Sequence, residues 1–305
     1  MKNNILEDLV KSVETQKLHV LNVVLRRDGE IIAEHDFEEE KPVHLWSASK
    51  TFTSMAIGIA ESEGYFRLKD NLSDYFAEAA KHEGFEKVTI HDLLCMGTGQ
   101  EKCPVEEAMN ENRQIDDIGE LFFKEPVVFA PGTHFVYNNS ATYMLSKLIS
   151  ITTGSSLKEF LMPRIFQPLG IPEPLWDSDE RGISFGCMGL HLTAHELSKF
   201  GQLLLNHGIW EGKQLIPSGY IEKATKKQIS TTDFNKFFAT ADHKQGYGYQ
   251  IWMNSYPGSY RIDGLYGQYV VMLPDKNAVV TYVSNEPSNM TGILELTWNT
   301  LIDRL

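Results

Sequence analysis

Apolar residues near the amino terminus recur at helical spacing, and the pattern then changes to that of a hairpin. Five of them share one face of an amphipathic helix: Ile5, Leu6, Leu9, Val10 and Val13. The next two segments, residues 19–26 and 30–37, are rich in Val, Ile and Leu, and Asp28-Gly29 between them is a tight-turn signal. The sequence therefore predicts a helix followed by a β-hairpin.

The middle of the chain carries helical periodicity. Within residues 46–60, apolar residues recur at helical spacing from Phe52 to Ala60. They follow Ser47-Ala48-Ser49, a cluster that can cap a helix, so we expect a helix to begin near Ser47. Further helical periods occupy residues 143–152, 157–166 and 194–207 and are separated by turn signals. This region is predicted to be mainly helical.

Beyond Gly246 the pattern indicates strands over residues 247–253, 268–273 and 278–284, followed by a helix over 290–305. Strands at both ends with helices between them predict an α+β fold, in which one antiparallel sheet is built from both chain ends and flanked by terminal helices. The helical middle is then a large insertion. We expect a discontinuous sheet domain, residues 1–69 and 236–305, a mainly helical domain, residues 70–235, and an active site at their junction.

Composition narrows the classes of function. A net charge of −13 repels phosphate backbones, and no Lys/Arg cluster reverses it locally, so nucleic acid is not an expected partner. The longest apolar stretches, such as residues 55–60, are far shorter than the roughly 20 residues that span a membrane. Acids interrupt the first ten residues, and the three cysteines form no Cys-x-x-Cys pair. We therefore expect a cytoplasmic protein without membrane anchorage or disulfides.

Candidate chemistry begins at Ser47-Ala48-Ser49-Lys50. On a helix this spacing puts the serine hydroxyl and the lysine amine on one face. Serine becomes a nucleophile when a base takes its proton, and a lysine can serve if burial and the helix dipole lower its pKa. Because apolar residues flank the motif, we expect Lys50 to be buried. The alternative, that Ser47 only caps the helix, is left open by the spacing.

Three rival patterns have weaker contexts. The second Ser-x-x-Lys, residues 155–158, follows Thr152-Thr153-Gly154 and is typical of a capped helix start with an exposed lysine. Residues 182–186 match the Gly-x-Ser-x-Gly elbow of α/β-hydrolases around Ser184, but polar residues precede them and a glycine-containing loop follows, so we expect a loop. His191 and His195 have zinc-binding spacing, yet Thr193 caps the expected helix and leaves His191 outside, so no metal is expected.

A second motif supports Ser47. Tyr137-Asn138-Asn139-Ser140 is the only Tyr-x-Asn in the chain, and with the Ser47 motif it resembles the serine β-lactamase and penicillin-binding superfamily. The resemblance is to the class C-like branch of esterases and D-amino-acid peptidases, and it spans nearly the whole chain. Its connecting segments are His91-Asp92-Leu93-Leu94, Ala130-Pro131-Gly132, Pro168-Leu169-Gly170 and Lys199-Phe200-Gly201-Gln202-Leu203.

The resemblance implies a role for each matched residue. Ser47 would be the nucleophile, Lys50 and Tyr137 the proton-handling pair, and Asn139 a hydrogen-bonding partner for Lys50 and for the substrate. A third family element, usually Lys-Thr-Gly or His-Thr-Gly, aligns here with residues 262–264, where Gly264 would let the strand backbone approach the substrate. The N–H groups of Leu265 and Ser47 would then form the oxyanion hole. No cofactor is implied, because the protein supplies every reacting group.

The third element departs from the family at Ile262 and Asp263, which replace a cation and a hydroxyl. Two like charges about 4 Å apart repel by roughly 4 kcal/mol at an effective dielectric near 20, which disfavours carboxylate substrates by about a thousandfold. Arg261 would restore a cation if the register shifted by one residue. The sequence therefore predicts a serine hydrolase of a small-molecule ester or amide, an esterase first. The alternatives are a D-amino-acid peptidase or weak β-lactamase using Arg261, and a non-catalytic relative that binds an acyl ligand.

Overall fold

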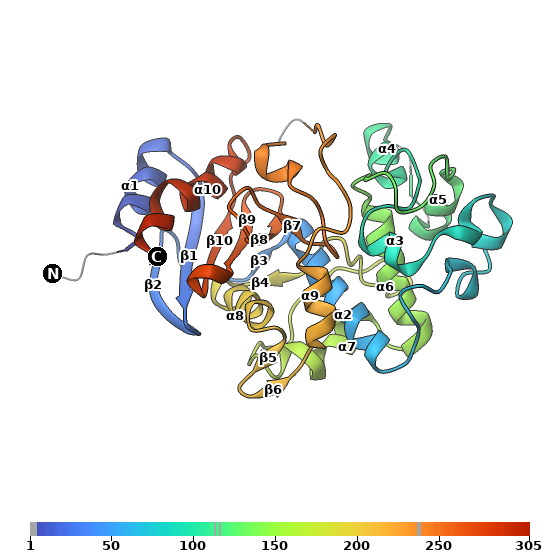
Figure 1. Ribbon diagram of the computed structural model, residues 1–305, viewed down its shortest axis with the longest axis horizontal. Helices are drawn as coiled ribbons and strands as arrows, with labels where there is room; N and C mark the ends of the chain where they lie inside the picture. Colours follow the sequence, from blue (N-terminus) through green and yellow to red (C-terminus); the bar gives the residue numbers. More distant parts are fainter. Residues whose placement is uncertain (1–4, 113, 116, 237–238) are drawn as a thin grey trace.

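Strands from the two ends of the chain meet in one six-stranded sheet. The computed structural model describes residues 5–112, 114–115, 117–236 and 239–305. The strand order is β2-β1-β10-β9-β8-β7, and every neighbouring pair is antiparallel. The first strand therefore pairs with the last one inside the sheet, one strand away from the β2 edge (Figure 1). This confirms the predicted antiparallel sheet with its helical insertion.

Ten strands and ten α-helices are assigned within the described residues. The strands are β1 (Val20–Arg27), β2 (Glu30–Asp36), β3 (Val43–His44), β4 (His191–Leu192), β5 (Ile209–Trp210), β6 (Lys213–Gln214), β7 (Trp252–Met253), β8 (Tyr260–Gly264), β9 (Gln268–Leu273) and β10 (Ala278–Ser284). The helices are α1 (Glu7–Gln16), α2 (Ser49–Ser62), α3 (Ile90–Leu94), α4 (Pro104–Asn110), α5 (Ile118–Lys124), α6 (Asn139–Thr153), α7 (Leu157–Leu161), α8 (Ala194–Leu205), α9 (Ser218–Ala224) and α10 (Met290–Leu296).

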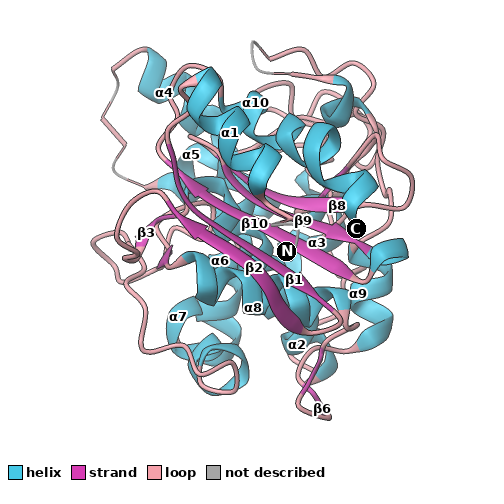
Figure 2. Cartoon of the chain, turned by 90° about the vertical axis from the view of Figure 1, so that its left-hand side faces the viewer, coloured by secondary structure: helices cyan, strands magenta, loops and turns pink. Residues whose placement is uncertain are grey.

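Helices cover both faces of the sheet (Figure 2). The terminal helices α1 and α10 lie on one face, and α8 and α2 lie on the other. Successive side chains of a strand point to opposite faces, so in β9 Tyr269 and Val271 pack toward the terminal helices while Val270 and Met272 pack toward α8. Every residue of β9 and β10 is consequently buried.

The strand predicted over residues 247–253 is wrong for its first half. Only Trp252 and Met253 form β7, because Gln250 adopts a left-handed backbone conformation with φ of 57°, which ends the extended chain. The buried Gln250 amide donates to the carbonyl oxygens of Leu93 and Leu94 and accepts from Thr142. A polar side chain thus fixes this segment against the helices α3 and α6.

Two helices end earlier than their apolar periods predict. α7 stops at Leu161 and continues as a π-helical turn over Met162–Phe166, where Pro163 has no N–H to donate to the ladder. The final helix likewise changes to a π-helical turn at Thr297. The short ladders β3-β4 and β5-β6 were not predicted, since two-residue strands leave no periodicity to detect.

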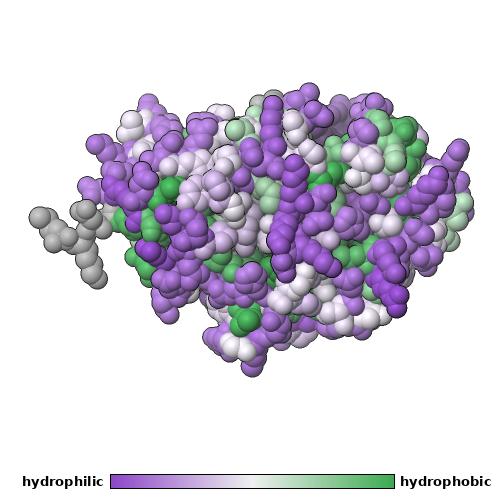
Figure 3. Space-filling view, viewed as in Figure 1, coloured by the Kyte–Doolittle hydropathy of each residue, from purple (hydrophilic) through white to green (hydrophobic). Residues whose placement is uncertain are grey.

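The surface seen in Figure 3 is largely hydrophilic, with apolar residues in separate patches, one of them at the end of the molecule that carries α4 and α5. Met109 on α4 is exposed there. Among the described residues, no helix has the length and apolar character needed to cross a bilayer. The division into domains at residues 69/70 and 235/236 stays a prediction.

Candidate active site

The Ser47 motif lies at a tight turn before α2. Trp46–Ala48 form a single 3-10 turn, and the α-helix begins at Ser49, two residues later than the nucleophile candidate. Trp46 has a positive φ of 51°, a conformation that is uncommon for an aromatic residue and costs on the order of 1–3 kcal/mol. Its N–H donates to Nδ1 of His44 at 3.0 Å, which helps to hold the turn. The turn presents the Ser47 side chain at the mouth of a pocket.

Lys50 reaches Ser47 from one turn further along. Its side chain is buried, and Nζ donates to Ser47 Oγ at 2.9 Å and to the Cys187 carbonyl oxygen at 2.9 Å. No side chain caps α2, so the alternative in which Ser47 serves only as a helix cap is wrong. The amine and hydroxyl are at the separation that proton transfer requires.

Tyr137 lies on the other side of Lys50. The Lys50 Nζ atom is 4.9 Å from the centre of the Tyr137 ring, a cation–π contact with the ring face. The Tyr137 ring in turn stacks on Trp252 of β7, with ring centres 5.9 Å apart. Lys50 on α2 thus contacts both Ser47, on the turn before α2, and Tyr137, on the segment before α6, and the latter two line one pocket.

Asn139 is placed differently from the expectation. Lys50 gives its second hydrogen bond to Cys187 rather than to Asn139, because the segment after Ser184 passes directly over the lysine amine. The Asn139 Oδ1 atom is buried and accepts no hydrogen bond from the described part of the chain. Since buried acceptors normally have partners, a ligand N–H is the natural donor for it.

Gly264, the glycine of the third element, lies against the turn Trp46–Ala48 that carries Ser47, here called the nucleophile turn. A side-chain carbon added at Gly264 would lie 2.4 Å from the Leu45 carbonyl oxygen and 3.0 Å from the Ala48 nitrogen. Only glycine allows β8 to come this close to Ser47. Leu265 follows at the strand end and lines the same pocket as Ser47. Ile262 is buried in the core on the opposite face and takes no part in the pocket.

Asp263 lines the pocket, and the neighbouring Arg261 guanidinium balances its negative charge. Its Oδ2 accepts from Arg261 Nε at 2.8 Å and lies 3.5 Å from His243 Nε2. Burial alone raises the pKa of Asp263, but the Arg261 guanidinium and His243 outweigh burial and hold the pKa below its ordinary value. Arg261 itself is fully buried and does not line the pocket. The repulsion of carboxylates expected from an isolated Asp263 is therefore reduced, and the register shift that would expose Arg261 does not occur.

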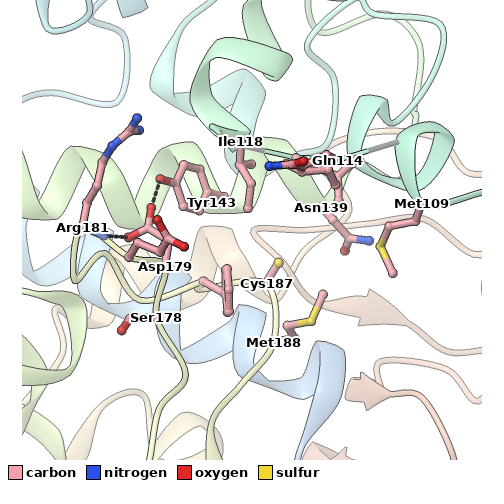
Figure 4. Close-up of a pocket in the computed structure, with 14 residues that line it drawn as sticks. Met109, Gln114, Ile118, Asn139, Tyr143, Ser178, Asp179, Arg181, Cys187 and Met188 are labelled. Atoms are coloured by element: carbon pink, nitrogen blue, oxygen red, sulfur yellow. Dashed lines mark hydrogen bonds between the residues drawn. The ribbon is translucent and has the colours of Figure 1, made fainter. Parts of the chain in front are cut away.

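Two adjoining cavities surround the site. The first, of about 470 Å³, is lined by Ser47, Tyr137, Asn139, Asp263 and Leu265, among others. The second, of about 580 Å³, shares Met109, Asn139 and Met188 with the first. Figure 4 shows these three shared residues on one side of the second cavity and Tyr143, Asp179 and Arg181 on the other. The Tyr143 hydroxyl donates to Asp179 at 2.7 Å.

The rival motifs have the local structures predicted for them. Ser156 caps α7 in a capping box with Glu159, and Lys158 pairs with Glu173 at 2.6 Å. Ser184 lies in a loop, not between a strand and a helix. These placements leave Ser47 as the serine with a lysine neighbour at a pocket.

The histidine pair is also separated, as the sequence predicts. Thr193 caps α8, which places His191 on β4 outside the helix. His195 is hydrogen-bonded to Glu34 and Glu40 instead. His191 and His195 therefore do not face a common ion.

Three participants were not foreseen from the sequence. The Cys187 carbonyl is a backbone group, and His243 and Trp252 come from segments whose side chains gave no catalytic pattern. The local feature that distinguishes His243 is a capping box, in which the Thr240 N–H donates to its Nδ1. A neutral His243 then carries its proton on Nε2, toward Asp263.

This pairing predicts a pH dependence of stability. Burial, followed by the Arg261 charge, lowers the pKa of His243 from 6.5. As pH falls below 6.5, the unfolded chain gains a proton before the folded one does, so the free energy of unfolding decreases by up to about 1.4 kcal/mol per pH unit. We expect His243→Phe to have a shallower loss of stability than the wild type between pH 6.5 and 5, measured by urea unfolding. Equal slopes for this variant, the wild type and the exposed control His134→Phe would contradict the expectation.

The sheet order, the helical insertion and the serine–lysine pair before α2 define a protein of the β-lactamase and penicillin-binding fold. The Beta-lactamase family model matches residues 5–301, and the chain belongs to this family. It is 22% identical to the 6-aminohexanoate-dimer hydrolase of Paenarthrobacter ureafaciens, over 86% of this chain and 71% of that protein. It is 24% identical to a β-lactamase of Escherichia coli K12, over 71% of this chain and 60% of that one.

A solved structure extends the comparison to the whole fold. EstCE1, described as a hydrolase with promiscuous acyltransferase activity, superposes with a TM-score of 0.78 at 14% identity. The match covers 97% of this chain and 98% of EstCE1. The family and its relatives are hydrolases, which supports an enzyme.

Proposed function

We propose that the protein is an esterase, or an amidase, that forms an acyl-enzyme on Ser47. The observation that carries the proposal is the 2.9 Å hydrogen bond between Lys50 Nζ and Ser47 Oγ at the mouth of the pocket. A serine with a buried amine at this distance has a partner for its proton as the C–O bond forms.

The reaction follows from the placement of these groups. Ser47 Oγ attacks the substrate carbonyl carbon, and the Lys50–Tyr137 pair takes its proton. The N–H groups of Ser47 and Leu265 stabilise the resulting oxyanion. Collapse of the intermediate releases the alcohol or amine, which takes up the proton through Lys50 and Tyr137, and water then hydrolyses the acyl-enzyme by the reverse proton route.

The charges around Ser47 favour a neutral substrate at the reacting carbonyl. Asp263 and the buried Arg261 cancel one another, so the strand side of the pocket offers neither a free cation for a carboxylate nor an unbalanced anion. The unpartnered Asn139 Oδ1 would accept an N–H from an amide substrate. The names of relatives include both a β-lactamase and a 6-aminohexanoate-dimer hydrolase, which keeps amides within the proposal.

The second cavity suits the acyl part of the substrate. The leaving group must face the proton donor, and Tyr137 lines the first cavity but not the second. The second cavity opens past Asn139 and has apolar walls from Val105, Ile118 and Phe185. An acyl chain that extends away from Tyr137 would enter it.

This placement predicts a preference for longer acyl chains. Each buried methylene contributes roughly 0.8 kcal/mol, so we expect kcat/KM for p-nitrophenyl octanoate to exceed that for the acetate by at least about tenfold. Ile118→Phe, which narrows the second cavity, should lower this ratio. The matched control is Ile151→Phe, at an exposed position on α6. A ratio near one in the wild type, or an equal ratio in both variants, would contradict an acyl cavity here.

The proposed activity is tested by burst kinetics and intact mass. With p-nitrophenyl butyrate we expect one equivalent of p-nitrophenol to be released rapidly, followed by a slower steady state. Mass spectrometry of the quenched protein should locate the butyryl group on Ser47. A single stable adduct without further release would instead favour an acyl-binding protein, and faster turnover of nitrocefin than of esters would favour a β-lactamase.

A further inference from the structure

Three metal-ligating side chains converge behind the nucleophile turn, outside the two cavities. His44 and His191 are directly opposite one another in the β3-β4 ladder, and their rings are 5.0 Å apart. The Asp177 Oδ2 atom lies 3.8 Å from His44 Nε2 and 3.9 Å from His191 Nε2. One ligand atom from each residue thus falls within 4.8 Å of the other two.

The backbone that carries these side chains is firmly held. The Asp177 N–H donates to the Gly189 carbonyl oxygen, and the Asp177 carbonyl oxygen accepts from Phe185. Gly189 has a positive φ of 93°, and a side-chain carbon there would lie 2.8 Å from the Asp177 Cβ atom. The Leu45 N–H donates to Leu190 on the other side. Three chain segments are therefore fixed side by side, each with one ligand pointing to a common point.

Asp177 forms no hydrogen bond with either His44 or His191. The separations of 3.8 and 3.9 Å exceed hydrogen-bonding distance, and within the described residues the Asp177 carboxylate accepts no hydrogen bond. In a tetrahedral zinc site, with metal–ligand distances of roughly 2.0–2.1 Å, neighbouring ligand atoms are roughly 3.3–3.4 Å apart. The side chains are 24–43% exposed, and the two separations from Asp177 would need to shorten by about half an ångström, while the third separation is within 4.8 Å before any adjustment.

We infer that His44, Asp177 and His191 bind one divalent transition-metal ion, and that its binding slows the reaction at Ser47. Two imidazoles and one carboxylate suit Zn²⁺, Ni²⁺ or Cu²⁺, whereas Mg²⁺ and Ca²⁺ prefer an all-oxygen shell. Three protein ligands leave a fourth position for water.

The effect on Ser47 follows from the proton on His44. In the structure His44 Nδ1 accepts from the Trp46 N–H, so a neutral ring carries its proton on Nε2. A metal on Nε2 requires the proton on Nδ1 instead, where it would face the Trp46 N–H as a second donor. The hydrogen bond is then lost at a residue whose backbone is already left-handed, directly before Ser47. Metal binding and the present form of the nucleophile turn are therefore antagonistic.

The binding is tested with the full chain, freed of metal by chelation, and Co²⁺ as the optical probe. We expect visible d–d bands that saturate at one equivalent, are displaced by Zn²⁺, and are unaffected by millimolar Mg²⁺ or Ca²⁺. His191→Ala and Asp177→Asn should each weaken Zn²⁺ binding at least tenfold. His195→Ala, which removes the histidine four residues away, and the exposed His134→Ala should retain it. Absence of saturable binding by the wild type, or equal losses in His191→Ala and His195→Ala, would overturn the site.

The antagonism is tested separately and rests on the proposed hydrolase activity. Zn²⁺ should inhibit p-nitrophenyl butyrate hydrolysis with half-maximal effect at the free concentration that half-saturates the site, and a chelator should reverse it. In His191→Ala the inhibition, relative to that variant's own metal-free rate, should require at least tenfold more Zn²⁺. Full activity with the site saturated would refute the antagonism, whereas loss of all turnover without metal would instead count against the hydrolase.

Discussion

Ser47→Ala is expected to remove the burst and to lower kcat/KM for p-nitrophenyl butyrate by at least about 10⁴-fold, because no other serine or threonine of the described residues lines this pocket. Lys50→Met should lower kcat/KM by a comparable factor, since removing one member of a catalytic unit costs about as much activity as removing the whole unit. The measurement is steady-state and single-turnover hydrolysis, with circular dichroism to show that each variant is folded. The Ser47 substitution removes one hydroxyl that bonds only to Lys50 Nζ in the described residues, so the fold should survive it.

The chain supplies matched controls for this prediction. Ser155→Ala alters the second Ser-x-x-Lys, and Ser184→Ala alters the Gly-x-Ser-x-Gly segment. Both should keep activity within about threefold of the wild type, because neither serine lines the cavity that contains Ser47. Turnover that persists in Ser47→Ala but is lost in either control would move the nucleophile elsewhere and end the present assignment.

Gly264→Ala is expected to lower kcat/KM by at least about 100-fold, because the added carbon would collide with Leu45 and Ala48 at 2.4 and 3.0 Å. The strand must move away from the nucleophile turn, and the Leu265 N–H moves with it. Removing one oxyanion donor typically costs about 10²–10³-fold in rate. Overpacking of this kind also costs roughly 1–3 kcal/mol of stability, which thermal unfolding would detect.

Gly219→Ala on α9 is the control for Gly264. Its added carbon would meet no atom within 4 Å, and its backbone is helical, so activity and the unfolding temperature should be unchanged or slightly raised. If Gly264→Ala retained wild-type hydrolysis, the close approach of β8 to the nucleophile turn would not be needed for catalysis.

The parts of the fold that sequence periodicity predicted well are those whose local pattern agrees with their packing. β9 and β10 have the predicted bounds, because runs rich in Val and Tyr and separated by Pro274 and Asn277 leave no other local choice. The pairing of Ser47 with Lys50 was also predictable, since three residues of helix fix their separation.

The features of the fold and site that could not be predicted from the sequence depend on contacts between distant segments. Gln250 ends its strand because its amide bonds to residues more than 150 positions away. The Asp263 charge was expected to act alone, whereas Arg261, two residues earlier on the same strand face, lies beneath it. The cluster of His44, Asp177 and His191 has no sequence spacing at all, because three separate segments supply it.

The pairing of β1 with β10 inside the sheet constrains how the protein is made. On the ribosome, the β1-β2 hairpin emerges long before β10, so one edge of β1 stays uncovered until residues 278–284 have been synthesised. The strand that carries Gly264 likewise emerges long after the nucleophile turn that it contacts. A nascent chain that is released early would expose an aggregation-prone edge rather than a partly working enzyme.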